Sequence, residues 1–159
     1  MTELRKVTLA VITSDTSILL GYKKRGFGSG KYNGFGGKPE SGESLLDCVI
    51  RETKEEVNIT LDPKKLTVVA ILYFYFEDKP EWNQQVHVYK TNSYLGTPTE
   101  SEEMKPAEFP LNAIPYDKMW IDDIHWLPLV LEGGKVKGSF TFAKDGSILK
   151  KELTLVEEL

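Results

Sequence analysis

Three glutamates are spaced so that their carboxylates could bind one divalent cation. Glu52, Glu55 and Glu56 stand at positions i, i+3 and i+4, so a helix across residues 44–57 would project all three from one face. Like charges within one turn repel each other unless a cation neutralises them, and hard carboxylate oxygens suit Mg²⁺ or Mn²⁺. The alternative interpretation is an acidic helix face that is simply solvated.

The same segment has the apolar stripe and the start signal of an amphipathic helix. Ser44, with Asp47 three residues further on, is typical of a helix start. At about 100° per residue, a set of mostly aliphatic side chains falls roughly 120° around the helix from the glutamates. These side chains are Leu46, Val49, Ile50, Thr53 and Val57. We therefore expect one buried face and one face of carboxylates.

A glycine and two charged residues extend this pattern on the N-terminal side. Gly37 is followed after five residues by Glu43, and Arg51 follows after seven more. The spacing is similar to the Nudix box. Nudix enzymes hydrolyse a nucleoside diphosphate linked to another group, so the resemblance implies metal-assisted cleavage of a pyrophosphate bond. Two positions depart from the box: Thr53 replaces an aliphatic residue, and Asn58 replaces the glycine that ends the helix.

The expected catalytic machinery combines a metal site with one ion pair. Its catalytic residues are Glu43, Arg51, Glu52, Glu55 and Glu56. The three helix glutamates would hold Mg²⁺, with Mn²⁺ able to replace it, together with the Gly37 carbonyl and a carboxylate that the family resemblance identifies as Glu103. The metal would lower the pKa of a bound water, and one glutamate would accept its proton. Glu43 is expected to pair with Arg51 and fix the helix against the preceding loop, with direct action on the substrate as the alternative.

A closer resemblance covers most of the chain, from Thr8 to the C-terminal hairpin. Residues 21–38, 96–104 and 119–123 are similar to the eukaryotic MutT-homologue family, which hydrolyses oxidised purine nucleoside triphosphates to the monophosphate and pyrophosphate. The resemblance implies that Asn33, Asp122 and Asp123 bind the purine edge and that Trp120 stacks on the base. The other implied substrate contacts are Thr8, Leu9, Lys23, Phe27, Phe35, Gly36, Gly37, Lys38, Phe74, Phe76 and Met104.

The chain departs from that family at the rim of the expected pocket. Tyr32 stands where the family commonly has tryptophan, Ile121 replaces a proline, and the loop at residues 81–85 is one residue longer. These changes bear on the preference among modified purines more than on the reaction. Lys23 and Lys38 flank the glycine-rich loop and could meet phosphate oxygens, with simple solvent exposure as the alternative.

The adjacent aspartates have a physical reason to serve in base recognition. Asp122 and Asp123 aimed at one uncharged base would resist ionising together, so one pKa should rise. A carboxyl that can be protonated or ionised serves as donor or acceptor, and so accepts more than one oxidised purine. The alternative interpretation is that the pair only caps the helix that leads into His125 and Trp126.

Composition places the chain among ordinary globular proteins. Its 159 residues, 40% hydrophobic and 28% charged, fit a single domain at residues 1–159. A net charge of −4 argues against general binding to nucleic acids or anionic membranes. The lone Cys48 fits a reducing compartment, and the N-terminus lacks an apolar signal region. We expect a monomer in the cytoplasm, with the nucleus and mitochondria as further locations, whose partner is a small nucleotide.

The elements that would position these residues form a mixed α/β (α+β) pattern. Strands are predicted at residues 6–13, 17–24, 66–77 and 85–91, with a hairpin over 136–157 that turns at Asp145-Gly146. Besides the helix at 44–57, residues 116–131 are predicted to be partly helical. We expect a mixed β-sheet sandwiched between helices, which is also the fold that the Nudix resemblance implies.

Three other functions compete with this hypothesis. Another Nudix hydrolase could act on a dinucleoside polyphosphate or a nucleotide sugar. A non-catalytic nucleotide sensor would be expected to have lost a carboxylate of the box, and none is missing here. A structural protein would not need a carboxylate face beside a glycine-rich loop.

Overall fold

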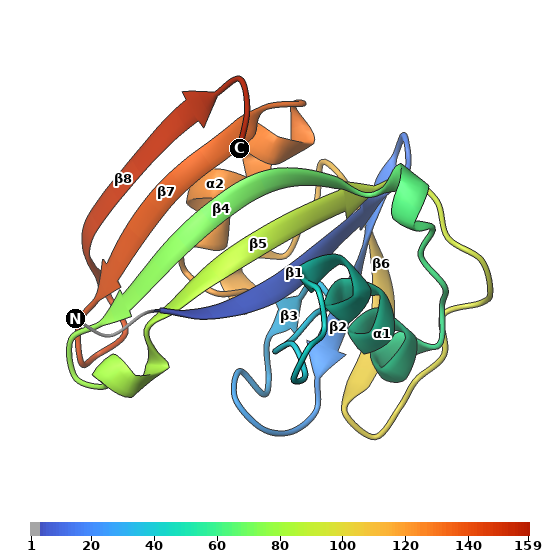
Figure 1. Cartoon of the computed structure of the whole chain (residues 1–159), viewed down its shortest axis with the longest axis horizontal. Coiled ribbons are helices and arrows are strands. Elements are labelled where there is room, and N and C mark those ends of the chain that lie inside the picture. The colour runs from blue at the N-terminus through green and yellow to red at the C-terminus, as the bar shows by residue number, and fades with distance from the viewer. Residues whose placement is uncertain (1–3) are drawn as a thin grey trace.

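One mixed sheet carries a helix on each of its faces in the computed structural model, which describes residues 4–159 (Figure 1). The strand order is β3-β2-β1-β5-β4-β7-β8, and β6 pairs with β2. The strands are β1 (Arg5–Thr13), β2 (Ser17–Lys23), β3 (Tyr32–Asn33), β4 (Thr67–Phe76), β5 (Gln84–Thr91), β6 (Met104–Pro110), β7 (Lys135–Phe142) and β8 (Ile148–Val156).

Helix α1 (Leu45–Val57) forms where the apolar periodicity predicts it. The Ser44 hydroxyl accepts the Asp47 N–H at 3.1 Å, which caps the first turn. Asn58 ends the helix in the left-handed conformation with φ 61°, the role that glycine fills in the Nudix box. Inside the helix, the Thr53 hydroxyl donates to the Val49 carbonyl at 2.7 Å, so this buried polar group is satisfied.

The two helices cover opposite faces of the sheet. Val49 and Val57 of α1 pack in a cluster with Ala10 and Ile12 of β1. Val11, between them in the sequence, belongs to the other cluster, together with residues of α2 (Asp123–Leu131). Because successive strand residues point to opposite faces, this alternation places α1 and α2 on the two sides. The predicted sandwich of a mixed sheet between helices is confirmed.

The sheet is split between β1 and β2, and the split leads to the functional site. These strands share register only at Ile12–Leu19 and Thr13–Ile18, near the turn that joins them. Further along, the segment at residues 34–37 lies against β1, where Ala10 and Phe35 form a bridge. A Cβ on Gly34 or Gly36 would clash with the backbone carbonyls of β1, so this close approach requires glycine. Side chains from the α1 side can therefore reach the same cleft as side chains from the α2 side.

Three short 3₁₀ helices complete the structure: η1 (Pro63–Lys65), η2 (Pro80–Trp82) and η3 (Tyr116–Lys118). The predicted hairpin is present as β7 and β8, with Gly146 at φ 86° in its turn. The predicted partly helical stretch resolves into η3 and α2. Two strands were not predicted, β3 and β6. Across residues 4–159, no helix is both long and apolar enough to cross a membrane.

Candidate active site

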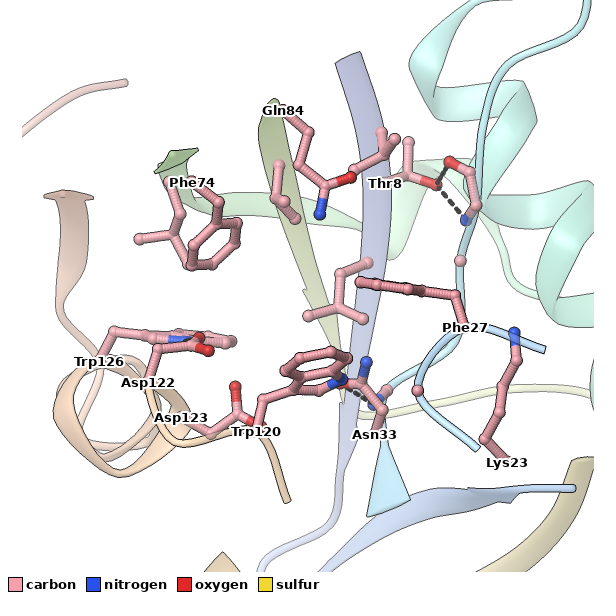
Figure 2. A pocket seen from close by; sticks show the side chains of 18 of the residues that line it. Thr8, Lys23, Phe27, Asn33, Phe74, Gln84, Trp120, Asp122, Asp123 and Trp126 are labelled. Atoms are coloured by element: carbon pink, nitrogen blue, oxygen red, sulfur yellow. Dashed lines mark hydrogen bonds between the residues drawn. The ribbon is translucent and has the colours of Figure 1, made fainter. Parts of the chain in front are cut away.

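A cleft of about 220 Å³ opens beside the split in the sheet (Figure 2). Thirteen residues predicted to contact substrate line it, and they come from segments far apart in the sequence. They are Thr8, Leu9, Lys23, Phe27, Asn33, Gly36, Gly37, Phe74, Phe76, Met104, Trp120, Asp122 and Asp123. The cleft also includes Glu56 of α1. The structure thus brings one helix glutamate and the aspartate pair to a single cavity.

Two buried carboxyls form one end of the cleft. Asp122 and Asp123 are each 4% exposed. Burial raises the pKa of Asp122, whose Oδ2 accepts the indole N–H of Trp126 at 2.9 Å. Burial also raises the pKa of Asp123 well above its usual range, and the neighbouring Asp122 charge adds to this effect. Burial therefore disfavours the ionised form of both carboxyls, and more strongly at Asp123.

The aspartates do not act as helix caps. Asp122 occupies the N-cap position of α2, but its side chain makes no capping hydrogen bond. Among the residues that the structure describes, the buried Oδ2 of Asp123 has no hydrogen-bond partner. An unpaired buried oxygen costs free energy unless something outside the chain binds it. The geometry favours a ligand over the capping interpretation.

Aromatic side chains close the mouth of this end. The Phe27 ring stacks on Trp120 with ring centroids 5.1 Å apart and meets Trp82 edge-on at 5.0 Å. Phe27 is 52% exposed and lies in a loop whose glycines 26, 28 and 30 all have positive φ. A Cβ on Gly28 would come within 3.2 Å of the Trp120 ring, so glycine permits this approach. Flat apolar surfaces of this kind suit the stacking of a planar base.

Asn33 adds one polar group to the lining of the cleft (Figure 2). It lies on β3, and its Oδ1 accepts the Gly34 N–H at 2.9 Å. That bond fixes the orientation of the amide, so its NH₂ group is presented as a donor. The Asn33 side chain therefore lines the cleft in one fixed orientation.

The other end of the cleft is built from the glycine segment and α1. Glu56 is 4% exposed, although its spacing predicts a solvent-facing carboxylate, and its Oε1 accepts the Gly36 N–H at 2.9 Å. Burial raises the pKa of Glu56 to about 8, and the negative charges of Glu52 and Glu103 contribute to this rise. A positive charge placed here would stabilise the ionised form of Glu56.

Arg51 organises the remaining carboxylates. It contacts Glu43 through two hydrogen bonds, Nε to Oε2 at 2.8 Å and Nη2 to Oε1 at 2.9 Å. This bidentate pair lowers the pKa of Glu43 to about 2. Arg51 Nη1 also donates to Glu52 at 3.1 Å and to Glu55 at 3.2 Å. The predicted Glu43–Arg51 pair is present and ties the loop after Gly37 to the helix.

Comparison with known proteins identifies the family. The model of the NUDIX domain matches residues 3–130. The chain belongs to the Nudix family.

Relatives with similar sequences extend over almost the whole chain. An oxidized purine nucleoside triphosphate hydrolase of Danio rerio is 40% identical over 153 residues, covering 96% of each chain. The protein of the same name from Mus musculus is 41% identical over 157 residues, covering 99% of each. Among solved structures, a mutator MutT protein from Bacillus halodurans superposes with a TM-score of 0.82 at 26% identity, covering 94% of this chain and 97% of that one.

Nudix hydrolases generally use divalent metal ions, and the donor chemistry here fits one. The buried Glu56 carboxylate has a raised pKa beside the charges of Glu52 and Glu103. Glu52 packs so closely on Gly37 that a Cβ there would lie 2.6 Å from its carboxyl carbon. In residues 4–159, however, no three His, Cys, Asp or Glu side chains converge as a metal cluster. Glu52 and Glu55 instead accept hydrogen bonds from Arg51. The case for a metal ion therefore rests on the carboxylate ligands that are present and on the burial of the Glu56 charge.

The predicted metal ligand Gly37 lines the cleft, and its carbonyl has hydrogen-bond partners inside the chain. Its carbonyl accepts the Thr8 N–H at 2.9 Å and the Thr8 hydroxyl at 3.2 Å, and it lies 3.5 Å from the Cys48 thiol. These bonds hold the glycine segment on β1. The role of Gly37 as a metal ligand stays a prediction.

Two predicted substrate contacts lie outside the cleft. Phe35 is fully buried in the cluster under α1, where its backbone pairs with Ala10. Lys38 is exposed, and its carbonyl accepts from Arg51 Nη2 at 3.3 Å. Successive residues of an extended segment point in opposite directions, so Phe35 faces the core while Gly34 and Gly36 line the cleft.

Several lining residues were missed from the sequence. They are Val7, Gly28, Gly34, Leu72, Gln84, Val86, Trp126 and Phe142. Strand alternation would have found some of them, because Gln84 and Val86 share a face of β5 and pair with Phe74 and Leu72 of β4. The predicted strand began at residue 85, which left Gln84 in the turn.

Proposed function

We propose that this Nudix enzyme hydrolyses oxidised purine (deoxy)nucleoside triphosphates, such as 8-oxo-dGTP and 2-hydroxy-dATP, to the monophosphate and pyrophosphate. Removing such nucleotides from the pool prevents their mutagenic incorporation into DNA. The observation that carries the proposal is the buried pair Asp122/Asp123, whose unpartnered Oδ2 lies in an aromatic cleft that also contains Glu56. Two relatives about 40% identical over their whole length bear the name of this activity.

The aspartate pair supplies the base recognition. With one carboxyl protonated and the other ionised, the pair would offer both a donor and an acceptor to the edge of a purine, and Asn33 adds an amide donor. Trp120 and Phe27 supply flat surfaces beside that edge. Because each carboxyl can be protonated or ionised, the same pocket can match the different donor patterns of oxidised guanine and oxidised adenine.

The α1 end supplies the hydrolytic chemistry. We propose that Glu52, Glu55, Glu56, Glu103 and the Gly37 carbonyl hold Mg²⁺, which Mn²⁺ can replace. When bound, such an ion neutralises phosphate charge and makes its water a stronger nucleophile. One glutamate of the set accepts a proton from the attacking water. Lys23, whose charge favours the ionised form of Glu56, faces the same cleft and is placed to bind phosphate oxygens.

Arg51 acts on this chemistry through the carboxylates that it holds. Its bidentate contact with Glu43 fixes the loop against α1, and its contacts with Glu52 and Glu55 limit their rotation. Glu43 and Arg51 are therefore positioning residues. Their ionised forms persist across neutral pH because the pair lowers the pKa of Glu43 and raises that of Arg51.

A substrate comparison tests the proposal directly. The purified chain should hydrolyse 8-oxo-dGTP and 2-hydroxy-dATP in Mg²⁺ far faster than dGTP, diadenosine tetraphosphate or ADP-ribose. Chelation with EDTA should abolish turnover, and Mn²⁺ should restore it. Preferred hydrolysis of diadenosine tetraphosphate or ADP-ribose would assign the protein to another branch of the Nudix family. Release of orthophosphate as the first product would exclude a diphosphatase.

The proposal also covers the oligomeric state and the cellular location of the enzyme. We propose a monomer in the cytoplasm, with the nucleus and mitochondria as further locations, that acts on free nucleotides. Light scattering coupled to gel filtration should give a mass near 18.0 kDa, and a dimer mass would contradict the monomer.

A further inference from the structure

An acidic loop, residues 97–103, brings a glutamate from outside α1 to the metal end of the cleft. Three of its last four residues are glutamates, and it leads into β6 beside α1 (Figure 1). Burial raises the pKa of Glu52 and of Glu56, and the charge of Glu103 adds to the rise at both. Since charges act strongly on each other only at close range, Glu103 lies near these two carboxyls of α1.

Hydrogen bonds fix the backbone of the acidic loop on both sides of residue 100. The Thr99 N–H donates to the Val57 carbonyl at 2.9 Å, which fastens the loop to the end of α1. The Ser101 hydroxyl accepts the N–H groups of Glu103 and Met104 at 3.3 and 3.2 Å. The Ser101 N–H donates to the Met104 carbonyl at 2.9 Å, so residues 101–104 form a tight turn. Glu103 therefore projects from a turn whose backbone is held.

Lys24, directly after β2, binds this turn from a different element. Its Nζ donates to Glu100 Oε2 at 2.6 Å and to the Ser101 carbonyl at 2.9 Å. Its backbone N–H donates to the Glu103 carbonyl at 2.7 Å. The preceding residue, Lys23, lines the cleft instead. Lys24 thus contacts the acidic loop on both sides of the turn that presents Glu103.

The position of the Lys24–Glu100 ion pair gives it a role other than fold stability. The two side chains are 35% and 49% exposed, and an exposed ion pair contributes little to the stability of a fold. In the metal-free protein, however, the negative charges of Glu52 and Glu56 repel Glu103 and favour movement of the acidic loop away from α1. The bonds of the Lys24 ammonium to the loop oppose that movement.

We propose that Lys24 is a positioning residue that holds Glu103 in place for the divalent metal ion. The inference rests on the proposed function, which assigns Glu103 to that ion. A ligand that is already oriented loses less conformational freedom when the ion binds, so the affinity for the ion increases. Polar partners of metal ligands commonly act in this way. Lys24 acts through Glu103 and not on the substrate.

The Lys24→Met variant removes the ammonium bonds but keeps the backbone bond to Glu103. Mn²⁺ binding to the nucleotide-free protein, measured by electron paramagnetic resonance, should weaken about fivefold. The Mg²⁺ concentration for half-maximal hydrolysis of 8-oxo-dGTP should rise by a similar factor. Lys24→Arg keeps the charge and should restore most of the affinity. Calorimetry in EDTA should show unchanged binding of 8-oxo-dGMP, because the base is held at the other end of the cleft.

Two further variants show whether Lys24 acts through Glu103. Glu103→Gln should itself weaken Mn²⁺ binding, and adding Lys24→Met to it should then have no further effect. Lys105→Met is the matched control, because the charge of the exposed Lys105 adds to the effect of Lys24 in lowering the pKa of Glu100. Removing that charge should change Mn²⁺ affinity by less than about twofold.

The possible results separate this inference from the proposed function. Equal Mn²⁺ affinity in the wild type and Lys24→Met, or the same weakening by Lys24→Met with and without Glu103, would overturn the role of Lys24. If the wild-type protein still needs a divalent ion and prefers oxidised purine triphosphates in that case, the proposed function stands. A wild-type protein that neither binds Mn²⁺ nor needs a divalent ion for hydrolysis would overturn both.

Discussion

At the scale of single residues, the burial of three carboxyls is the feature of the site that costs the fold most stability. Glu56, Asp122 and Asp123 are each 4% exposed, and burial raises the pKa of all three. Burying an ionisable group without a compensating partner destabilises a fold. A fold selected only for stability would therefore have other residues at these three positions. A cation at Glu56 and a base at the aspartates are the partners that account for them.

Glu56 makes the stability of the metal-free protein depend on pH. Its pKa is about 8 in the folded chain and near 4.5 when unfolded, so the folded state holds the proton longer. Its stabilising effect is complete below about pH 4.5 and is lost as the pH rises through about 8. Glu56→Gln should therefore raise the free energy of unfolding at pH 8.5 by on the order of 3 kcal/mol. Urea denaturation in EDTA at pH 5 and pH 8.5 measures this difference.

The exposed Glu55→Gln change is the control for that stability measurement and should leave the pH dependence unaltered. Catalysis should respond in the opposite direction to stability. Glu56→Gln keeps the acceptor for the Gly36 N–H but removes a charge, so kcat in saturating Mg²⁺ should fall roughly a thousandfold. A variant that is both more stable at high pH and nearly as active as the wild type would show that Glu56 is not a metal ligand.

The aspartate pair should couple base selectivity to pH. Burial raises the pKa of both carboxyls, most of all that of Asp123, so wild-type affinity for the base should decline as the pH rises and the protonated carboxyl ionises. Asp123→Asn keeps a donor at every pH but no longer titrates. We expect a flatter pH profile and a loss of about 1–3 kcal/mol in discrimination between 8-oxo-dGTP and dGTP.

Kinetics across pH 6–9 measure this effect, with the exposed Asp117→Asn as control. Unaltered selectivity in both Asp122→Asn and Asp123→Asn would show that the pair has no part in reading the base.

At the scale of elements, patterns that repeat along the chain were predictable. Helix α1 follows from its apolar period and its Ser44 cap, and β7–β8 follows from alternation around Asp145-Gly146. Strand β6 was missed because Pro106 and Pro110 lie within it. Proline lacks the N–H group that a central strand requires, but β6 pairs only with β2 and tolerates it. Which strands are at an edge depends on the whole sheet, so the local sequence could not show it.

The functional site shows the same contrast between what the local sequence predicts and what tertiary pairing decides. Residue types and spacing were enough to select Glu56 and the aspartate pair, but they did not show which way each backbone group faces. The Gly37 carbonyl turns toward Thr8 because the glycine segment pairs with β1, a contact between residues 29 positions apart. Gln84 enters the wall because β5 begins one residue earlier than its alternation suggests. Both features are set by tertiary pairing.

The end of α1 gives a prediction at this scale. Asn58 has φ 61°, a conformation that costs a residue with a Cβ about 1 kcal/mol and glycine almost nothing. Asn58→Ala should lower the free energy of unfolding by about 1 kcal/mol, and Asn58→Gly should raise or maintain it. Urea denaturation gives both values. A destabilising glycine would mean that the asparagine side chain, and not its backbone, stabilises the cap.

At the scale of the whole molecule, the split sheet joins two sites that lie on different faces. The aspartates belong to the α2 side and Glu56 to the α1 side, yet the opening between β1 and β2 places them along one cleft. A nucleotide whose base is held at the α2 end must extend its phosphates toward α1. The fold thereby decides which phosphorus atom lies near the glutamates.

Isotope labelling shows which phosphorus is attacked. Cleavage between the α and β phosphates in ¹⁸O-water places the label in only one product, because a single P–O bond is formed. The resemblance to MutT-type enzymes implies attack at the β phosphorus, so we expect the label in pyrophosphate and none in the monophosphate. Mass spectrometry of both products after single-turnover hydrolysis of 8-oxo-dGTP measures it. Label in the monophosphate would mean that the bound triphosphate extends further past α1, with its α phosphorus at the glutamates.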